Sequence, residues 1–121
     1  HLISIPRKRI SIRSGITFSA VLEKNEEIIY CSNLLANAIN LQYCFGFQYK
    51  NNTYGKPLLL ESNPRVQGSM VMSTLANANI IYSSIKSLLG EDVPEFNINW
   101  DTKFLRYWGA IGVSNSEVTK I

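Results

Sequence analysis

Hydrophobic and polar residues alternate in three segments of the chain, residues 16–23, 41–50 and 95–100. A period of two is typical of a β-strand with one buried face, because successive side chains point to opposite sides of the sheet. Residues 2–14 are also expected to be extended, although Pro6 interrupts the phase of the alternation. We therefore predict a strand in each of these four segments.

A β-hairpin is predicted in the middle of the chain. The segment KPLLLE, residues 56–61, follows the polar stretch NNTYG. Turn-forming residues between two hydrophobic segments are a hairpin signal, so residues 41–50 and 56–61 should pair as antiparallel strands.

The spacing of apolar residues predicts a helix over residues 26–40. Asn25 can cap this helix, and the acidic residues that follow it suit the positive end of the helix dipole. The alternative is that KNEE forms a turn that leads into a strand, IIYCS. The helix is favoured, because apolar residues recur at steps of three, four and three: Ile28, Cys31, Leu35 and Ala38.

A second, longer helix is predicted to begin at Asn63–Pro64 and to end at Gly90. Asn is a good N-cap, and Pro is tolerated at the first helical position because its missing N–H has no partner there. Ser69 is an alternative cap, since Gly68 can interrupt the first turn. Six apolar residues then step by four, three, four, three and four along one face: Val71, Leu75, Ala78, Tyr82, Ile85 and Leu89.

These elements predict an α+β fold. After the N-terminal strand their order is strand, helix, strand, strand, helix, strand, which is the ferredoxin-like (split βαβ) order. In this arrangement two helices cover one face of an antiparallel sheet and the other face is open. If residues 26–32 formed a strand instead, the order would suit a profilin-like or PAS-like sheet.

The strand predicted at residues 41–50 carries a row of large side chains, and their orientation decides where a binding surface lies. Its centre, Phe45-Gly46-Phe47, resembles three positions of the RNA-recognition strand, whose aromatic residues stack on bases. Burying two glutamines and a lysine under the sheet would cost a few kcal/mol each, whereas leaving the rings in water forgoes roughly 2–3 kcal/mol each. The rings should therefore face the core, and no function is carried over from the resemblance. The row is Leu41, Tyr43, Phe45, Phe47 and Tyr49.

The opposite side of the predicted sheet should then be polar. Four amide side chains are expected on it: Gln42, Gln48, Asn97 and Asn99. Amides suit hydrogen bonding to a polar partner, including phosphates and sugars.

Basic residues are concentrated at the N-terminus. The first fifteen positions hold four of them without an acidic residue, and the rest of the chain carries eight basic against nine acidic residues. The net charge of +3 therefore comes from this segment. We expect a basic edge strand that contacts an anionic partner, nucleic acid first. The alternative is a solvated edge whose charges prevent association between sheets. The predicted nucleic-acid-binding residues are Arg7, Lys8, Arg9 and Arg13, with Lys50 and Lys56.

The sequence offers no recognisable catalytic or metal-binding constellation. Its one His stands at position 1, and Cys31 and Cys44 are far apart, so neither a zinc site nor a triad that needs an internal His is expected. The glycine-rich motifs that cradle phosphates, G-x-G-x-x-G and G-x-x-x-x-G-K-S/T, do not occur. We predict no cofactor and no metal, and an enzyme is only the third functional candidate.

The C-terminal segment, residues 101–121, is rich in aromatic residues. It is expected to dock on the core, or alternatively to bind a protein partner or a second copy of the chain, because Trp, Tyr and Arg are common anchors of interfaces. The residues predicted for this interface are Phe104, Arg106, Tyr107 and Trp108.

Taken together, the 121 residues predict one α+β domain with a basic edge strand at residues 1–15 and an aromatic tail at residues 101–121. Its first predicted function is a non-catalytic binding or assembly module for nucleic acid or an acidic protein. The alternative is a protein-interaction subunit of a larger complex or virus particle. No membrane span is expected, and an intracellular or intravirion setting is favoured over secretion.

Overall fold

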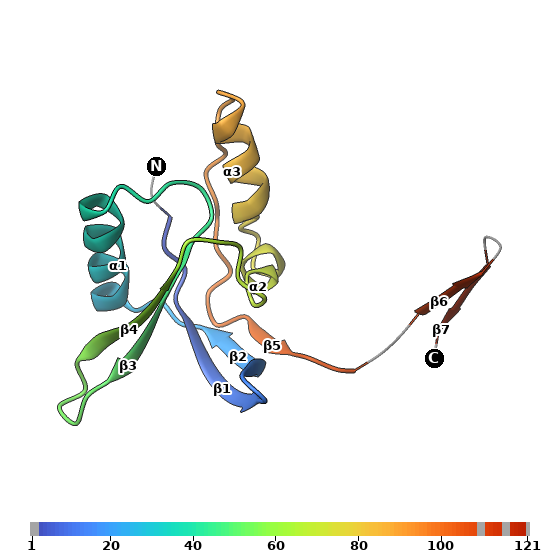
Figure 1. Ribbon diagram of the computed structural model, residues 1–121, viewed down its shortest axis with the longest axis horizontal. Coiled ribbons are helices and arrows are strands. Elements are labelled where there is room, and N and C mark those ends of the chain that lie inside the picture. The colour runs from blue at the N-terminus through green and yellow to red at the C-terminus, as the bar shows by residue number, and fades with distance from the viewer. Residues whose placement is uncertain (1–2, 109–110, 115–116, 121) are drawn as a thin grey trace.

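The computed structural model describes residues 3–108, 111–114 and 117–120, which form a mixed α+β fold with antiparallel sheets and three helices (Figure 1). The elements are β1 (Arg7–Arg13), β2 (Ile16–Leu22), α1 (Glu26–Ala38), β3 (Gly46–Asn51), β4 (Pro57–Asn63), α2 (Val71–Leu75), α3 (Ile80–Leu88), β5 (Lys103–Leu105), β6 (Ile111–Ser114) and β7 (Glu117–Lys120). None of the helices in these ranges is long and apolar enough to cross a membrane.

Strands β1, β2 and β5 form a three-stranded antiparallel sheet with β2 in the centre. Ser14 and Gly15 join β1 to β2 with φ angles of 47° and 77°. Two consecutive positive φ angles are typical of the type I′ turn, whose twist matches that of a hairpin. The predicted basic strand is therefore present, and it lies at an edge of this sheet.

Strands β3 and β4 form a separate two-stranded antiparallel sheet, and β6 pairs with β7. The ferredoxin-like order and a sheet with two helices on one face are not confirmed. Strand β2 is paired on both sides, by β1 and by β5, and the β3–β4 hairpin is not hydrogen-bonded to that sheet.

The helix predicted at residues 26–40 is confirmed as α1. The Asn25 side chain accepts a hydrogen bond from the backbone N–H of Ile28 at 3.0 Å, as an N-cap does. The prediction that residues 41–50 form one strand was wrong in its first half, since β3 begins only at Gly46. Tyr43 has a φ of 61°, which is incompatible with an extended strand.

The long helix predicted from Asn63 to Gly90 was also wrong. Asn63 ends β4, and two short helices, α2 and α3, follow. Asn77, with a φ of 68°, separates them, and Asn79 caps α3 by accepting from the N–H of Tyr82 at 3.0 Å. The apolar spacing continued through this break, so periodicity alone did not reveal it.

The strand predicted at residues 95–100 is absent, because this segment has no regular secondary structure. Its alternation nevertheless reflects burial, since Ile98 and Trp100 pack against the core. The strand that pairs with β2 is β5, a few residues later.

The hydrophobic core lies between the three-stranded sheet and α2. Its buried members come from β2 and from the segment that contains α2: Ala20, Leu22, Met72 and Ala76. Partly buried apolar residues from other segments pack against them: Ile5, Ile98, Trp100 and Phe104. A second layer forms where α1 packs near the β3–β4 hairpin, since the hydroxyl groups of Ser32 and Tyr49 are 3.0 Å apart. The rings of Phe45, Phe47 and Tyr49 contact one another in sequence. These three rings are half-buried and Tyr43 is exposed, so the predicted core role of the row is met only in part.

Candidate functional site: a basic cleft between the two sheets

Strand β1 presents two arginines on the side that faces the β3–β4 hairpin. Arg7 and Arg9 are two positions apart in the strand, so their side chains share a face. Lys8, between them, forms an exposed ion pair with Glu23 at 3.3 Å. Because side chains alternate along β1, the ion-paired Lys8 lies on one face of the strand, and Arg7 and Arg9 lie on the other face, toward the hairpin.

The polar side of the hairpin carries a small hydrogen-bond network. Gln48 of β3 lies opposite Glu61 of β4, and its amide donates to Glu61 Oε2 at 3.0 Å. The Asn63 amide donates to Glu61 Oε1 at 2.6 Å. Both carboxylate oxygens of Glu61 are thereby held in place, because Glu61 and Asn63 share a face of β4.

Two neutral amides connect the arginines of β1 to the other elements. The Arg9 guanidinium donates to Gln48 Oε1 at 2.5 Å. The Arg7 guanidinium donates to Gln67 Oε1 at 2.5 Å, between residues that are sixty positions apart. Gln67 lies in the loop between β4 and α2. These contacts join the edge of the first sheet to the hairpin and its following loop.

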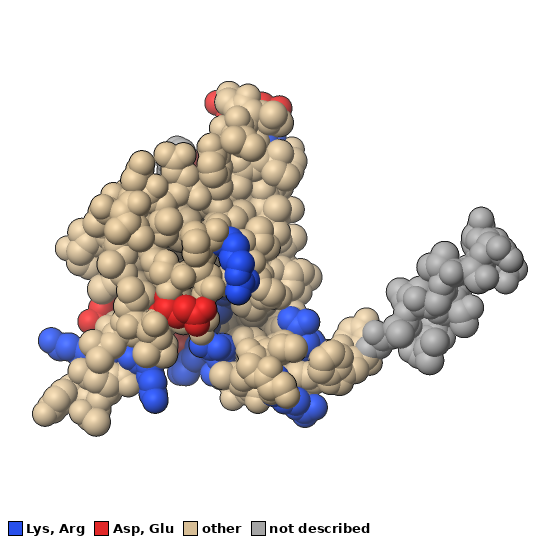
Figure 2. Space-filling model, viewed as in Figure 1, with Lys and Arg blue, Asp and Glu red and all other residues tan. Residues whose placement is uncertain are grey.

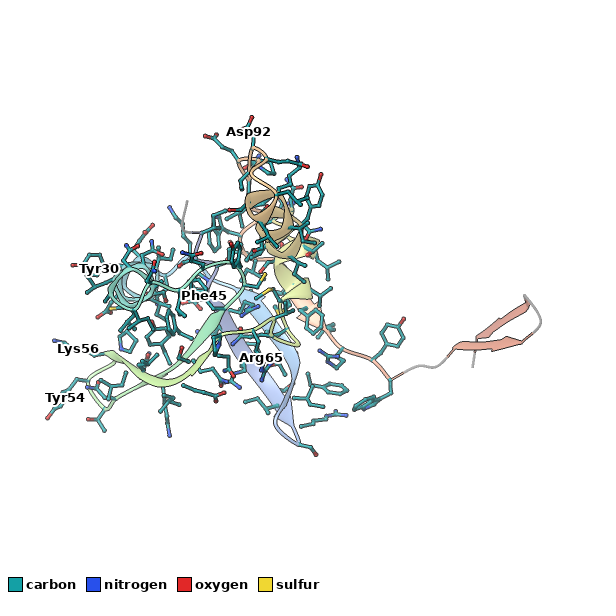
Figure 3. All side chains as sticks on the ribbon, turned by 45° about the horizontal axis from the view of Figure 1, so that its top comes forward. Tyr30, Phe45, Tyr54, Lys56, Arg65 and Asp92 are labelled. Carbon is teal, nitrogen blue, oxygen red and sulfur yellow. The ribbon has the colours of Figure 1, made fainter. Side chains whose placement is uncertain are left out.

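The arginines line a cleft of about 700 Å³, which is within the usual size range of small-molecule sites. Figure 2 shows most of the Lys and Arg side chains on the lower half of this face, over the strands, with acidic side chains among them and further acidic side chains at the upper end, beyond α3. Figure 3 places Arg65 between the hairpin and β1. Four arginines from β1, the loop after β4 and the segment after β5 border the cleft: Arg7, Arg9, Arg65 and Arg106.

Lys8 and Glu23, which also line the cleft, form an ion pair, but the cleft arginines have no carboxylate partner of this kind among the described residues. Burial lowers the pKa of Arg7 from its ordinary value, and the neighbouring Arg9 charge lowers it further. Within the described part of the chain, no carboxylate oxygen lies within 4 Å of the four cleft arginines. Arg106 instead donates to the carbonyl oxygens of Thr17 and Gly68 at 3.2 and 3.3 Å. A bound anion would relieve this repulsion.

Asn63 lines the cleft, and Glu61, on the same face of β4, is connected to Arg9 through the Gln48 amide. Residues 3–108 and the two short C-terminal stretches contain no group of three or more His, Cys, Asp or Glu that could hold a metal by itself. Mg²⁺ needs less from the protein, because it commonly takes one or two protein oxygens together with water and substrate phosphates. A carboxylate on the same strand face as an Asn, two positions away, offers two side chains that can supply such oxygens.

The structure separates the six predicted nucleic-acid-binding residues. Arg7, Lys8 and Arg9 border the cleft. Arg13 lies outside it, with its guanidinium 4.0 Å from the centre of the Phe18 ring. Lys50 and Lys56 are exposed on the hairpin, and Figure 3 shows Lys56 near its far end. Three of the six residues therefore border the cleft and three lie outside it.

The four amides predicted for one sheet face do not share a face. Only Gln48 belongs to a strand. Gln42 is exposed in the connection before β3, whereas Asn97 and Asn99 lie in the irregular segment before β5 and bind the α2–α3 connection through their backbones, at Asn77 and Ala76. The prediction assumed strands in both places, and neither is formed.

The predicted interface residues also fall into two groups. Phe104 packs against the core and Arg106 borders the cleft. Tyr107 and Trp108 are 85% and 73% exposed. Trp108 contacts the Phe18 ring at a centroid distance of 5.9 Å. The part of the aromatic tail at residues 109–110, 115–116 and 121 lies outside the described residues.

Sequence reasoning missed Glu61, Asn63, Arg65 and Gln67. The signal is the order acid, amide, base at every second position from Glu61, at the end of a predicted strand. We interpreted Asn63–Pro64 as a helix start, which hid this pattern. Extending the strand to Asn63 would have placed the carboxylate and the amide on one face.

We expect Arg7→Met to raise the free energy of unfolding of the full chain by about 0.5–2 kcal/mol, because it removes a desolvated charge beside Arg9 and retains an unbranched apolar side chain. The matched change Arg13→Met should lower it by about 0.5–1 kcal/mol, since an exposed cation–π contact is lost. Urea unfolding at low ionic strength measures both. A loss of more than 1 kcal/mol in Arg7→Met would show that the charge is compensated within the fold.

Comparison with known proteins gives one family. The model described as "ATP-grasp in the biosynthetic pathway with Ter operon" matches residues 1–106, a range that includes the whole cleft. No curated protein and no solved structure matches the chain.

Proposed function

The chain belongs to the family described as ATP-grasp in the biosynthetic pathway with Ter operon, and on that premise we propose that its basic cleft binds the phosphates of ATP. The observation that carries this proposal is the group of arginines around the cleft that have no carboxylate partner among the described residues. The role of the chain is then to hold a nucleotide for a biosynthetic reaction.

Guanidinium groups suit this task chemically. Each presents several N–H donors in a planar arrangement that matches two phosphate oxygens at once. Arg7 and Arg9 project from β1, and Arg65 projects from the opposite wall. Donors that approach from both sides can hold a polyphosphate and stabilise charge that develops on it during phosphoryl transfer.

Glu61 and Asn63 would hold the Mg²⁺ that accompanies ATP, through a carboxylate oxygen and the amide oxygen. When bound, the metal ion would neutralise part of the phosphate charge. Gln48 supports this division of roles. Its amide accepts from Arg9 and donates to Glu61, and it thus stands between the two charges. The arginine is available for an anion and the carboxylate for a cation.

Two other predictions remain as proposals. The anionic partner could be nucleic acid, as the basic edge strand suggested, and Arg13, Lys50 and Lys56 would then contribute. The exposure of Tyr107 and Trp108 favours a protein interface as a second function of this chain. An intracellular setting also stays a proposal, and it agrees with ATP as the ligand.

We expect the full chain to bind ATP, and Arg7→Met and Arg9→Met each to weaken binding by about ten- to a hundred-fold, the equivalent of losing one charge-assisted hydrogen bond. Arg13→Met and Lys50→Met, which remove charges outside the cleft, should change the affinity by less than about twofold. Isothermal titration calorimetry in Mg²⁺ at fixed ionic strength measures this.

The same variants separate ATP from nucleic acid. Binding of a single-stranded oligonucleotide that falls steeply with salt and weakens equally in all four variants supports the nucleic-acid proposal. Absence of ATP binding by the full chain at low salt would overturn the nucleotide proposal.

Glu61→Gln should act in opposite directions with and without metal. In Mg²⁺ it should weaken ATP binding by about tenfold, because a charged metal ligand is lost; in EDTA it should strengthen binding, because a negative charge near the phosphates is removed. Glu26→Gln, an exposed change on α1, is the control. Equal effects of Glu61→Gln in both buffers would argue against a metal at Glu61.

We expect the full chain to associate at micromolar concentration if Tyr107 and Trp108 form an interface, and Trp108→Ala to reduce this association by at least tenfold. Sedimentation velocity over a concentration series measures it. Tyr54→Ala, which removes an exposed ring at the end of the hairpin, should have no effect. A chain that sediments as a monomer throughout would overturn self-association through this segment.

A further inference from the structure

Gly46, the first residue of β3, lies where the Gln67 side chain crosses the hairpin. A Cβ atom built on Gly46 would overlap the carboxamide of Gln67 at a distance that real Cβ atoms do not show. The overlap involves only the far end of a flexible side chain. Only glycine therefore leaves room for Gln67 in its present position, and a larger residue would displace Gln67 without breaking the strand.

Gln67 uses this position to reach Arg7. Its amide oxygen accepts from the Arg7 guanidinium at 2.5 Å, and its own backbone carbonyl accepts from the N–H of Met70 at 2.9 Å. The second bond anchors the loop in front of α2. Gln67 thus connects the loop to the guanidinium at the end of the long Arg7 side chain on β1.

The chemistry of the acceptor matters as much as its position. An amide oxygen orients the guanidinium but leaves its charge intact. A carboxylate at the same place would form an ion pair and compete with any incoming anion. For a site that must hold a positive charge ready for a ligand, Gln is suitable and Glu is not.

We propose that Gln67 is a positioning residue, which directs the Arg7 charge into the cleft without neutralising it, and that Gly46 provides the space this requires. The inference rests on the proposed function in that the anion is the polyphosphate of ATP. Gln67 itself does not contact the ligand, because it acts through Arg7.

The test is the affinity of the full chain for ATP and for inorganic tripolyphosphate, measured by calorimetry. Gln67→Ala and Gly46→Ala should each weaken both ligands by about tenfold, because Arg7 is present but no longer oriented. Gln67→Glu should weaken them at least as much as Arg7→Met does, although it retains an acceptor at the same length. Gln42→Ala, which removes an exposed glutamine amide outside the cleft, should change neither affinity.

A double-mutant cycle distinguishes positioning from direct contact. If Gln67 acts through Arg7, the variant Arg7→Met/Gln67→Ala should bind no more weakly than Arg7→Met alone. Additive losses, or a Gln67→Glu variant that binds as well as the original chain, would overturn the inference and leave the proposed function intact. A wild-type chain that binds neither ligand would instead overturn the proposed function, and this inference with it.

Circular dichroism and urea unfolding check that each variant is folded. Should Gly46→Ala fail to fold, the glutamine variants and the cycle still decide the outcome, since neither requires a change in the strand.

Discussion

Neutral amide side chains hold the two arginines of β1, and the rest of the site depends on this choice of partner. Gln67 fixes Arg7 and Gln48 fixes Arg9, each through a guanidinium-to-amide hydrogen bond. Because an amide carries no net charge, the two guanidinium groups repel each other and are not neutralised, and the pKa of Arg7 falls as a result of burial and this repulsion. Such an arrangement stores unfavourable electrostatic energy that an anion can release on binding. The stability of the empty fold and the affinity of the site are therefore opposed.

The division of the strands into two sheets makes the cleft possible. If the hairpin continued the three-stranded sheet, Arg9 and Gln48 would lie on one flat surface. Instead β1 ends one sheet, the hairpin forms another, and long polar side chains span the space between them. The contacts across this space are hydrogen bonds between side chains rather than a backbone ladder.

The sequence predicted the local elements better than their assembly. Helix α1, the basic strand and the hairpin followed from capping, charge and alternation, which act over a few residues. The long helix failed because its apolar spacing continues through Asn77, where a left-handed residue and the Asn79 cap start a new helix. The strand expected at residues 95–100 failed because alternation reports burial on one side, and an irregular segment against the core can show it as well. The position of the helix break and the irregular form of residues 95–100 are both set by tertiary contacts, which a short-range pattern does not report.

The candidate site was partly predictable for the same reason. Burial energies assigned the rings of β3 to the core, and this assignment requires Gln48 to point the other way. The structure places Gln48 there, between Arg9 and Glu61. The pattern could not predict that three segments far apart in the chain meet at the site. These segments are β1, the end of β4 and the segment after β5. Side-chain contacts between residues so distant in sequence leave no periodic signal. The sequence can therefore identify a polar residue that lies on the strand face opposite a row of rings. The residues that it contacts can be identified only from the three-dimensional structure.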